Sequence, residues 1–575
     1  MARSNQIARI ILAWLVIVLA DLFIVRDYAW VIDNWDIKRV AVNFGLSSLA
    51  MLLLLFVLKP ILARSNVIKV VVFIVIALPV LVQMSHFEVY RSLTSSFGFH
   101  AFTEDPWMTL SLWVEQFNIL KSIIILSIVF WLIKLLSFSS KPMVKWRYAL
   151  NTIGFILLYL LTTFSWYGVS NFQNSALAYY STLLQMSKDQ ALEFNRDKFQ
   201  VPKSDASIGG LPNIIYIVGE SLTLSHMSIY GYEKNTTPKL KALEDNKRLI
   251  AFDNALSIGT HTRLSVPYML VGMEGIDPLG RFYQTPTIFN YAKARGYNTA
   301  FVSAQDTAWG HIKELFIDND VDYFFDGLQM NKNASVHKGA DDMQILKEVA
   351  IPYISNQTKP FMLVLQMDGS HYPYDMHSSQ QHKKFLPELE ENSINAYDNT
   401  VVKTDDYIAA LINYAQDKNP NTWVFYSSDH GQGLGGKSGM FNQSFVKNTI
   451  HNPLLIAPPK GQYNKLLLNK HQPVSQADIV PTILDIIAIK PHANINGRSL
   501  LNQQSDDRMR VVSKYMPTQH NEKKAVLVNP DLNYYFIDFE KMSVTMPNGK
   551  KTIQFKDWDK NYQQIFIDKA PALFD

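Results

Sequence analysis

The sequence contains no cysteine, and charge of neither sign dominates it. Without cysteine, the chain cannot use a cysteine nucleophile, a cysteine metal ligand or a disulfide. The 54 Lys and Arg residues nearly balance the 50 Asp and Glu residues, which leaves a net charge of +4. Such a balance does not suggest a basic surface, so no nucleic-acid partner is expected. With 575 residues, the chain is too long for one ordinary domain.

The N-terminal third is instead rich in long apolar runs that carry few charges. Each run approaches or exceeds the ~20 residues needed to cross a bilayer. The five runs span 7–25, 41–62, 67–84, 119–138 and 149–166. The first run is not followed by a small-residue cleavage motif, so we expect it to be an anchor and not a removed signal peptide. The sequence therefore predicts a five-helix transmembrane domain over residues 1–168.

Basic residues predict the orientation of these helices in the membrane. They lie before or at the start of the first run, after the second and after the fourth, at Arg3, Arg9, Arg64, Lys69, Lys141, Lys145 and Arg147. Short loops rich in Lys and Arg remain cytoplasmic, so five crossings place the C-terminal part on the outer side. We expect an interfacial helical linker over residues 169–210 and a globular domain over residues 211–575.

In the globular part, short β-rich apolar segments alternate with helix patterns. The strand candidates are "NIIYIVGES", "NTAFVSAQD", "PFMLVLQMDGS", "NTWVFYSSDHG" and "NPLLIAPP", and each ends in polar residues. Between them, Thr285 and Pro286 suit the start of a helix and Gly296 suits its end. This alternation predicts an α/β fold with a mostly parallel central sheet covered on both faces. In such sheets, ligands bind beyond the carboxyl ends of the strands.

Polar residues with metal-binding chemistry follow three of these segments. Glu220 ends the first strand candidate, Asp429 and His430 end the fourth, and Thr262 follows "AFDNALSIG". Carboxylate oxygens and an imidazole nitrogen suit zinc or manganese. An open fourth position taken by a hydroxyl would make a catalytic site, because a metal-bound hydroxyl loses its proton more readily. Each residue alone could equally be a turn or cap residue, and spacing does not establish that they meet.

Four further residues are candidates for substrate binding. Arg263 could neutralise phosphate charge, or it could be a solvated residue at a helix start. Thr260 could form a hydrogen bond within its turn or donate to a phosphate. Gln305 and Asp306 end a predicted strand at the same edge of the sheet and could contact the substrate.

Several motifs resemble a known family. The segments "GESLTLSHMSIYGYEKNTTPKLKAL", "SSDHG", "SQADIVPTILDII" and "NGRSL" occur in the order typical of the sulfatase-like branch of the alkaline phosphatase superfamily. With "GTHTRLSVP" and five preceding membrane helices, they resemble the membrane phosphoethanolamine transferases, which are related to the lipoteichoic acid synthases. The resemblance implies that Thr262 is the nucleophile and a metal ligand. It also implies that Glu220, Asp429 and His430 are the other ligands, and that His371 contacts the substrate phosphate.

The same resemblance implies a function. A zinc-dependent enzyme, with manganese possible, would transfer phosphoethanolamine from phosphatidylethanolamine through a phosphothreonine-type intermediate. The acceptor would be lipid A or another envelope glycan, and the protein would be a multi-pass protein of a bacterial inner membrane with a periplasmic C-terminal domain. Phosphoglycerol transfer from phosphatidylglycerol and a non-catalytic, membrane-anchored scaffold remain alternatives. Hydrolysis as in type I sulfatases is disfavoured, because those enzymes need a cysteine or serine in a C/S-x-P-x-R context, and the chain has no cysteine while "SVPYM" lacks the arginine.

The sequence departs from the family pattern at four positions. Ile258 and Tyr268 stand where the family usually flanks its nucleophile with cysteines. Gln432 and Asn442 stand where it usually has a glutamate and a further histidine after the Asp-His pair. The last two replacements leave open whether a second metal binds and which head group is moved.

Overall fold

A computed structural model of the protein consists of two compact units, Met1–Ala191 and Leu192–Asp575, which we call the N-terminal and C-terminal units. The residues that the structure describes are 2–26, 31, 40–90, 93–94, 99, 102, 106, 110, 114, 117–137, 144–164, 173–186, 201, 210–307, 312–332, 338–389, 393–435, 440–441, 445–515, 523–539, 541–547, 549 and 551–569.

The N-terminal unit contains five helices that are long and apolar enough to cross a membrane, which confirms the five predicted spans. They are α1 (Ala2–Ala20) with the π-helical turn η1 (Asp21–Val25), α4 (Gly45–Leu62) preceded by η2 (Val40–Phe44), α5 (Asn66–Tyr90), α8 (Ile119–Ser137) and α9 (Lys145–Phe164). Buried aliphatic side chains pack between α1, α4, α5 and α8, while many large apolar side chains are exposed on the outside. Lipid tails cover such outward faces in a bilayer. A further helix, α10 (Ser175–Met186), lies within the expected linker.

A seven-stranded sheet forms the centre of the C-terminal unit, in the order β2-β10-β7-β1-β6-β4-β5. Its strands are β1 (Asn213–Gly219), β2 (Ile250–Phe252), β4 (Asn298–Ser303), β5 (Tyr323–Phe325), β6 (Phe361–Gln366), β7 (Thr422–Ser428) and β10 (Leu454–Ala457). The five strands from β7 to β5 are parallel, and β10 and β2 add an antiparallel edge. The five strand candidates of the sequence correspond to β1, β4, β6, β7 and β10. The predicted α/β class with a mostly parallel sheet is confirmed.

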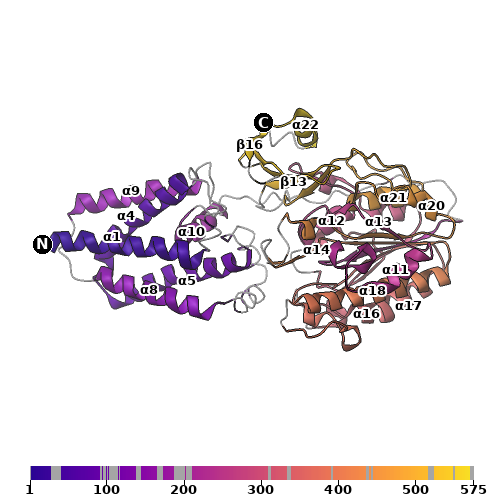
Figure 1. Cartoon of the computed structure of the whole chain (residues 1–575), viewed down its shortest axis with the longest axis horizontal. Helices are drawn as coiled ribbons and strands as arrows, with labels where there is room; N and C mark the ends of the chain where they lie inside the picture. Colours follow the sequence, from indigo (N-terminus) through magenta and orange to yellow (C-terminus); the bar gives the residue numbers. More distant parts are fainter. Residues whose placement is uncertain are drawn as a thin grey trace. The chain divides into compact units, whose positions relative to one another are not determined.

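Helices cover both faces of this sheet (Figure 1). One face carries α11 (Pro238–Asp245), α16 (Asp342–Ile345), α17 (Ile351–Ser355) and the long helix α18 (Ile394–Lys418); the other carries α12 (Thr262–Met269), α13 (Ile288–Ala294), α20 (Tyr463–Leu467) and α21 (Ile479–Ile486). On the second face, apolar side chains of α12, α13 and α21 form one buried cluster with strand residues such as Tyr216 and Phe425. Burial on both faces explains why β1, β6 and β7 are apolar almost throughout.

The helix predicted to begin at Thr285 and Pro286 begins later, at Ile288. Thr287 caps α13 together with Asn290, whose side-chain oxygen accepts from the backbone N–H of Thr287 at 2.7 Å. The hydroxyl of Thr285 instead donates to the carbonyl of Arg281 at 2.7 Å, at the end of a short 3-10 turn. The prediction of the helix start was therefore wrong by two residues, and the cap belongs to the second threonine.

The last part of the chain forms a separate antiparallel sheet that the sequence patterns did not reveal. Its order is β12-β13-β14-β15-β16, with strands β12 (Arg510–Ser513), β13 (Lys524–Val528), β14 (Tyr534–Asp538), β15 (Ser543–Thr545) and β16 (Thr552–Gln554), followed by α22 (Lys560–Lys569). A buried aromatic cluster that includes Phe539, Phe555, Trp558 and Phe566 stabilises this region.

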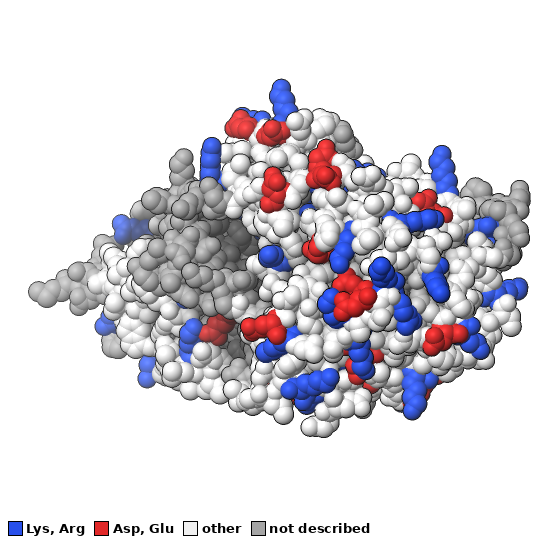
Figure 2. Space-filling view, turned by 45° about the vertical axis from the view of Figure 1, so that its right-hand side comes forward, with Lys and Arg blue, Asp and Glu red and all other residues white. Residues whose placement is uncertain are grey.

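Charged side chains of both signs are interspersed on the face of the molecule shown in Figure 2. This distribution agrees with the nearly balanced composition of the sequence. A mixed surface of this kind produces no extended field of one sign on that face.

Candidate active site

Two neighbouring parallel strands bring three polar residues together at their carboxyl ends. β1 pairs with β7 in a register that sets Gly219 opposite Ser428. The next residue after β1 is Glu220, and the next two after β7 are Asp429 and His430. Residues separated by about 200 positions in the sequence therefore become neighbours because their strands end side by side.

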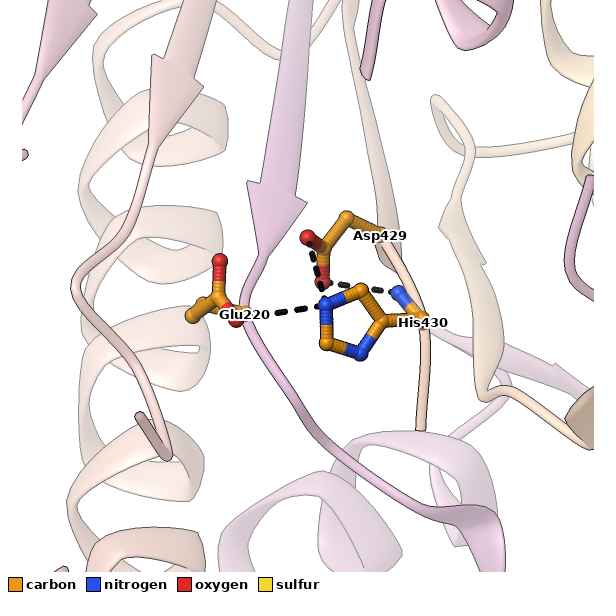
Figure 3. Close-up of side chains that lie close together, drawn as sticks. All are labelled: Glu220, Asp429 and His430. Atoms are coloured by element: carbon orange, nitrogen blue, oxygen red, sulfur yellow. Dashed lines mark hydrogen bonds and ion pairs between the residues drawn. The ribbon is translucent and has the colours of Figure 1, made fainter. Parts of the chain in front are cut away.

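Glu220, Asp429 and His430 form a compact, buried group. Their candidate ligand atoms all lie within 4.8 Å of one another (Figure 3). Nε2 of His430 lies 3.3 Å from Oδ2 of Asp429 and 3.6 Å from Oε1 of Glu220. The three side chains converge on a common point, as the predicted metal site requires.

The hydroxyl of Thr262 joins this group from the first residue of α12. Its Oγ1 donates to Oε2 of Glu220 at 3.2 Å and lies 3.3 Å from Nε2 of His430. Thr262 is only half-buried, whereas Glu220, Asp429 and His430 are buried. The threonine is therefore the member of the group that a molecule from outside can reach.

The hydrogen bonds of His430 make one ring nitrogen available for a metal. Nδ1 lies 2.8 Å from the carbonyl oxygen of Gly431, which can only accept, so we place the ring proton on Nδ1. Nε2 then presents a lone pair toward the carboxylates. Burial lowers the pKa of His430, which keeps the ring neutral. A backbone carbonyl that orients the ring in this way is typical of metal-binding histidines.

The two carboxylates are held so that a cation would compensate their charge. Oδ1 of Asp429 accepts from the backbone N–H groups of His430 at 2.7 Å and Ser221 at 3.1 Å, while Oδ2 has no hydrogen-bond donor among the described residues. Burial, and then the neighbouring Glu220, raise the pKa of Asp429 well above its ordinary value. A carboxylate oxygen without a hydrogen-bond donor among the described residues, beside a second carboxylate and an imidazole nitrogen, fits a divalent metal.

The backbone around Glu220 is tightly packed. Ser221 has a positive φ of 54°, which is unusual for a residue with a side chain, and its hydroxyl donates to Oε1 of Glu220 at 2.6 Å. Gly369, with φ of +56°, lies so close that an added Cβ would stand 2.9 Å from Cβ and from the carbonyl oxygen of Glu220. The N–H of Ser370 donates to that carbonyl at 3.0 Å. The loop after β6 is therefore fixed against the loop after β1.

His371 lies on this loop and is partly exposed, unlike the three buried residues. Its Nδ1 lies 2.5 Å from the carbonyl oxygen of Tyr372, which leaves Nε2 for another partner. Burial lowers the pKa of His371. The pKa of Glu220 is lowered although burial opposes this, because His430 and then His371 lie nearby. The structure therefore places His371 near the group without making it part of the metal-binding set.

The remaining substrate-binding candidates differ in their surroundings. Arg263 is half-buried next to Thr262, and Asp306 is half-buried at the end of the loop after β4. Thr260 is fully buried, and its hydroxyl has no hydrogen-bond partner in the described part of the chain. Thr260 therefore does not line an accessible surface.

Gln305 is bound to the group itself. Its Nε2 donates to Oε2 of Glu220 at 3.0 Å and to the carbonyl of Met367 at 2.8 Å. Its Oε1 accepts from Nε2 of Gln366 at 3.0 Å. The predicted position at the sheet edge is found, but the amide is occupied by protein groups, so the geometry favours a positioning role for Gln305 over substrate contact.

Replacing Gln305 with leucine is expected to weaken metal binding by about 10–100-fold, because a residue that orients a ligand tunes its affinity. Zinc titration of the purified C-terminal unit or full chain, monitored by calorimetry, would measure this change. Gln357→Leu is the matched control. The side chain of Gln357 forms hydrogen bonds with Tyr353 and with Asn298 at the amino end of β4, which is the end of the strand away from the site. An unchanged zinc affinity combined with a raised KM would instead indicate direct contact with the substrate.

The positions that depart from the family pattern are accommodated within the fold. Ile258 and Tyr268 are buried, and the hydroxyl of Tyr268 donates to Oδ2 of Asp277 at 3.0 Å. Gln432 is buried and donates to the hydroxyl of Tyr374 at 2.7 Å. Asn442 lies outside the described residues.

Sequence reasoning missed residues that support the site. Asp342 accepts from the N–H groups of Asp368 at 2.8 Å and Gly369 at 3.1 Å, and so holds the loop that carries His371. His377 forms a buried ion pair with Asp368 at 2.8 Å. The motif "MDGSH" indicates the loop, but no local pattern indicates that Asp342, from another helix, closes it.

Comparison with known proteins agrees with this geometry. Residues 212–489 match the sulfatase family model, and this segment contains every residue of the group. Over this segment, which is just under half of the chain, the protein is similar to the sulfatase family. Kdo(2)-lipid A phosphoethanolamine 7''-transferase of Escherichia coli is 28% identical over 256 residues, which cover 43% of this chain and 42% of that protein. Phosphatidylethanolamine transferase Mcr-1 of Escherichia coli is also 28% identical, over 43% of this chain and 47% of that protein.

The likeness in fold to this family extends through the membrane helices. The integral membrane lipooligosaccharide phosphoethanolamine transferase A of Neisseria meningitidis superposes with a TM-score of 0.58 and covers 82% of this chain and 95% of that structure. At 16% identity, this similarity concerns the fold. The sequence matches to the two curated relatives above span less than half of either protein's length.

Proposed function

We propose that this protein transfers phosphoethanolamine from phosphatidylethanolamine to lipid A or another envelope glycan, with Thr262 as the nucleophile. The observation that carries the proposal is the position of the Thr262 hydroxyl, which meets Glu220 and His430 while remaining partly accessible. The similarity to Kdo(2)-lipid A phosphoethanolamine 7''-transferase and to phosphatidylethanolamine transferase Mcr-1 supports the choice of the transferred group.

In the first step, Oγ1 of Thr262 attacks the phosphorus of the donor. The new bond joins threonine to phosphorus, the bond from phosphorus to the diacylglycerol oxygen breaks, and diacylglycerol leaves with a proton. Glu220 accepts the hydrogen bond of the attacking hydroxyl and can take its proton. In the second step, an acceptor hydroxyl or phosphate attacks the same phosphorus, and Thr262 leaves and regains its proton.

The charge that develops on the phosphoryl oxygens needs positive partners. A zinc or manganese ion held by Glu220, Asp429, His430 and Thr262 would act as a Lewis acid and favour the deprotonated threonine. His371 lies near the group with its Nδ1 at the carbonyl oxygen of Tyr372, and Arg263 follows Thr262 directly. Asp306 at the adjacent strand end is a candidate for binding the ethanolamine ammonium, and Gln305 orients Glu220.

The proposed location follows from the charges that flank the helices. The Lys and Arg residues at alternate helix ends favour an orientation with the C-terminal unit on the outer side, and the resemblance to the bacterial transferases makes that side the periplasm of an inner membrane. A phospholipid donor in the outer leaflet of that membrane would then be available to the site. The use of a phospholipid donor would explain the five N-terminal helices, because a soluble hydrolase does not need membrane helices.

Head-group-labelled phospholipids test the donor and the intermediate. Full-length protein in vesicles is incubated with labelled phosphatidylethanolamine or phosphatidylglycerol, and peptides are then analysed by mass spectrometry. We expect label on Thr262 from phosphatidylethanolamine and its later transfer to a lipid A fraction. Label from phosphatidylglycerol alone would establish phosphoglycerol transfer instead, and no label from either lipid would support the non-catalytic scaffold.

A further inference from the structure

The N-terminal unit encloses a cavity that the proposed chemistry does not use. Its volume is about 290 Å³, and its walls are formed mainly by aliphatic side chains from α1, α4, α5 and α8, with a contribution from α9 and α10. Met51, Leu55, Val80, Val129 and Leu132 are among them. Because the helices around it are suited to span a membrane, molecules dissolved in the bilayer are those best placed to enter.

Polar residues gather where α1 ends and α10 begins. Oδ2 of Asp21 forms an ion pair with Nη1 of Arg26 at 3.2 Å and accepts from the N–H of Ser175 at 3.1 Å. The backbone N–H of Asn174 donates to the hydroxyl of Ser47 at 2.9 Å. These bonds fix the polar residues in place, and Asp21, Asn174 and Ser175 line the cavity. Ionisable residues within membrane helices usually mark a functional site.

Two polar atoms in this wall have no hydrogen-bond partner in the described part of the chain. They are Oδ1 of Asp21, which can accept, and Nδ2 of Asn174, which can donate. Both residues are almost fully buried, with side chains of 3% and 1% exposure. Buried polar atoms without partners are unfavourable, so this end of the cavity is suited to a ligand that supplies both a donor and an acceptor.

We propose that the cavity binds an acyl chain of a glycerolipid, with the polar end of that lipid at Asp21 and Asn174. A hydroxyl or ammonium group would donate to Oδ1 of Asp21, and an ester carbonyl would accept from Nδ2 of Asn174. The aliphatic side chains of the cavity wall would contact the acyl chain. Diacylglycerol and phosphatidylethanolamine share this chemistry, since the first offers a hydroxyl and the second an ammonium. The site goes beyond the proposed phosphoryl transfer and does not depend on it.

Lipid retention by the purified full-length protein tests the site. After extensive washing in detergent, native mass spectrometry and lipid extraction are expected to find about one glycerolipid for each chain. Ala20→Phe places a ring in the cavity that Ala20 lines, and should lower retention by about tenfold or more. Ala8→Phe, at an exposed position of the same helix, is the matched control and should retain the lipid.

A second variant tests the polar end without filling the cavity. Asn174→Asp keeps the oxygen that accepts from the N–H of Ala176 at 3.2 Å but removes the Nδ2 donor. It should also lower retention. If washed wild-type protein holds no glycerolipid, or if Ala20→Phe and Asn174→Asp both retain it as wild type does, the proposal is overturned. Equal loss in Ala8→Phe would likewise overturn it, because retention would then depend on the outer lipid shell.

The Thr262→Ala variant distinguishes whether the bound lipid is the donor or the reaction product. It also tests the cavity site separately from the proposed transfer function. Retention should persist in this variant, because Thr262 belongs to the C-terminal unit. Diacylglycerol found in wild type but replaced by phosphatidylethanolamine in Thr262→Ala would identify the occupant as the reaction product. Phosphatidylethanolamine in both would identify a site for the donor lipid. Retention with no transfer activity in wild type would uphold the cavity site and refute the proposed function.

Discussion

Replacing Thr262 with alanine is expected to abolish phosphoryl transfer, lowering the rate by about 10⁴–10⁶-fold. The hydroxyl is the partly accessible member of the group at which Glu220 and His430 converge, so its loss removes the atom that would bond to phosphorus. The fold should remain intact, because Glu220 keeps its hydrogen bonds from Ser221 and Gln305. Transfer of labelled head group to lipid A and the thermal unfolding midpoint would be measured together.

Two further variants define the specificity of this effect. Thr262→Ser retains a hydroxyl and should recover much of the lost rate. Thr552→Ala removes an exposed threonine from β16 and should leave transfer unchanged. If Thr262→Ala still acquires a covalent head group, another residue is the nucleophile and the proposed mechanism is wrong.

Replacing Asp429 with asparagine is expected to have opposite effects with and without metal. Zinc affinity should fall by at least about a hundredfold, since a charged ligand is lost. The metal-free variant should nevertheless be more stable than metal-free wild type by roughly 1–3 kcal/mol, because one of two buried carboxylates is neutralised. The new side-chain N–H₂ can also donate to Nε2 of His430, which lies 3.3 Å from the present Oδ2. Unfolding of both forms with zinc and with a chelator would measure this.

The pH dependence of metal-free stability provides a separate check on Asp429. Its pKa is raised in the folded protein, so the unfolded chain releases this proton at a lower pH than the folded chain does. The contribution of Asp429 to stability is therefore most favourable below about pH 4 and is lost as pH rises through the folded pKa. The stability advantage of Asp429→Asn should grow as pH rises. Asp417→Asn, at an exposed position of α18, should show no such trend.

An advantage of Asp429→Asn that stayed constant with pH would show that the carboxylate is not strained by its neighbours. Full zinc affinity in this variant would show that Asp429 is not a ligand. Each result would remove the electrostatic argument for a metal at this position.

The location of the site could be predicted from the sequence because apolar strands with polar ends leave a clear pattern. Glu220, Asp429 and His430 each follow a strand that is buried along its whole length. Their proximity could not be predicted from spacing, because it depends on β1 and β7 being neighbours in the sheet. Without knowledge of strand order, residues about 200 positions apart cannot be assigned to one site.

Other features of the structure leave no sufficient local pattern in the sequence. Thr285 and Thr287 are both suitable caps, and tertiary contacts decide between them: the N–H of Ile288 donates to the carbonyl of Leu270 at 2.8 Å. The strand end at Gln305 was predicted, but a strand end does not reveal whether an amide faces solvent or a neighbouring carboxylate. The C-terminal sheet consists of strands of three to five residues, which are too short for a reliable periodic pattern.

The close approach of Gly369 to Glu220 limits how the loop after β6 can move relative to the loop after β1. There is no room for a side chain between the two backbones, and the N–H of Ser370 donates to the carbonyl of Glu220, so a shift of the segment bearing His371 would disturb Glu220. If the protein transfers a head group as proposed, a bulkier one would have to be accommodated elsewhere, and Arg263 and Asp306 are candidates because their side chains are partly exposed.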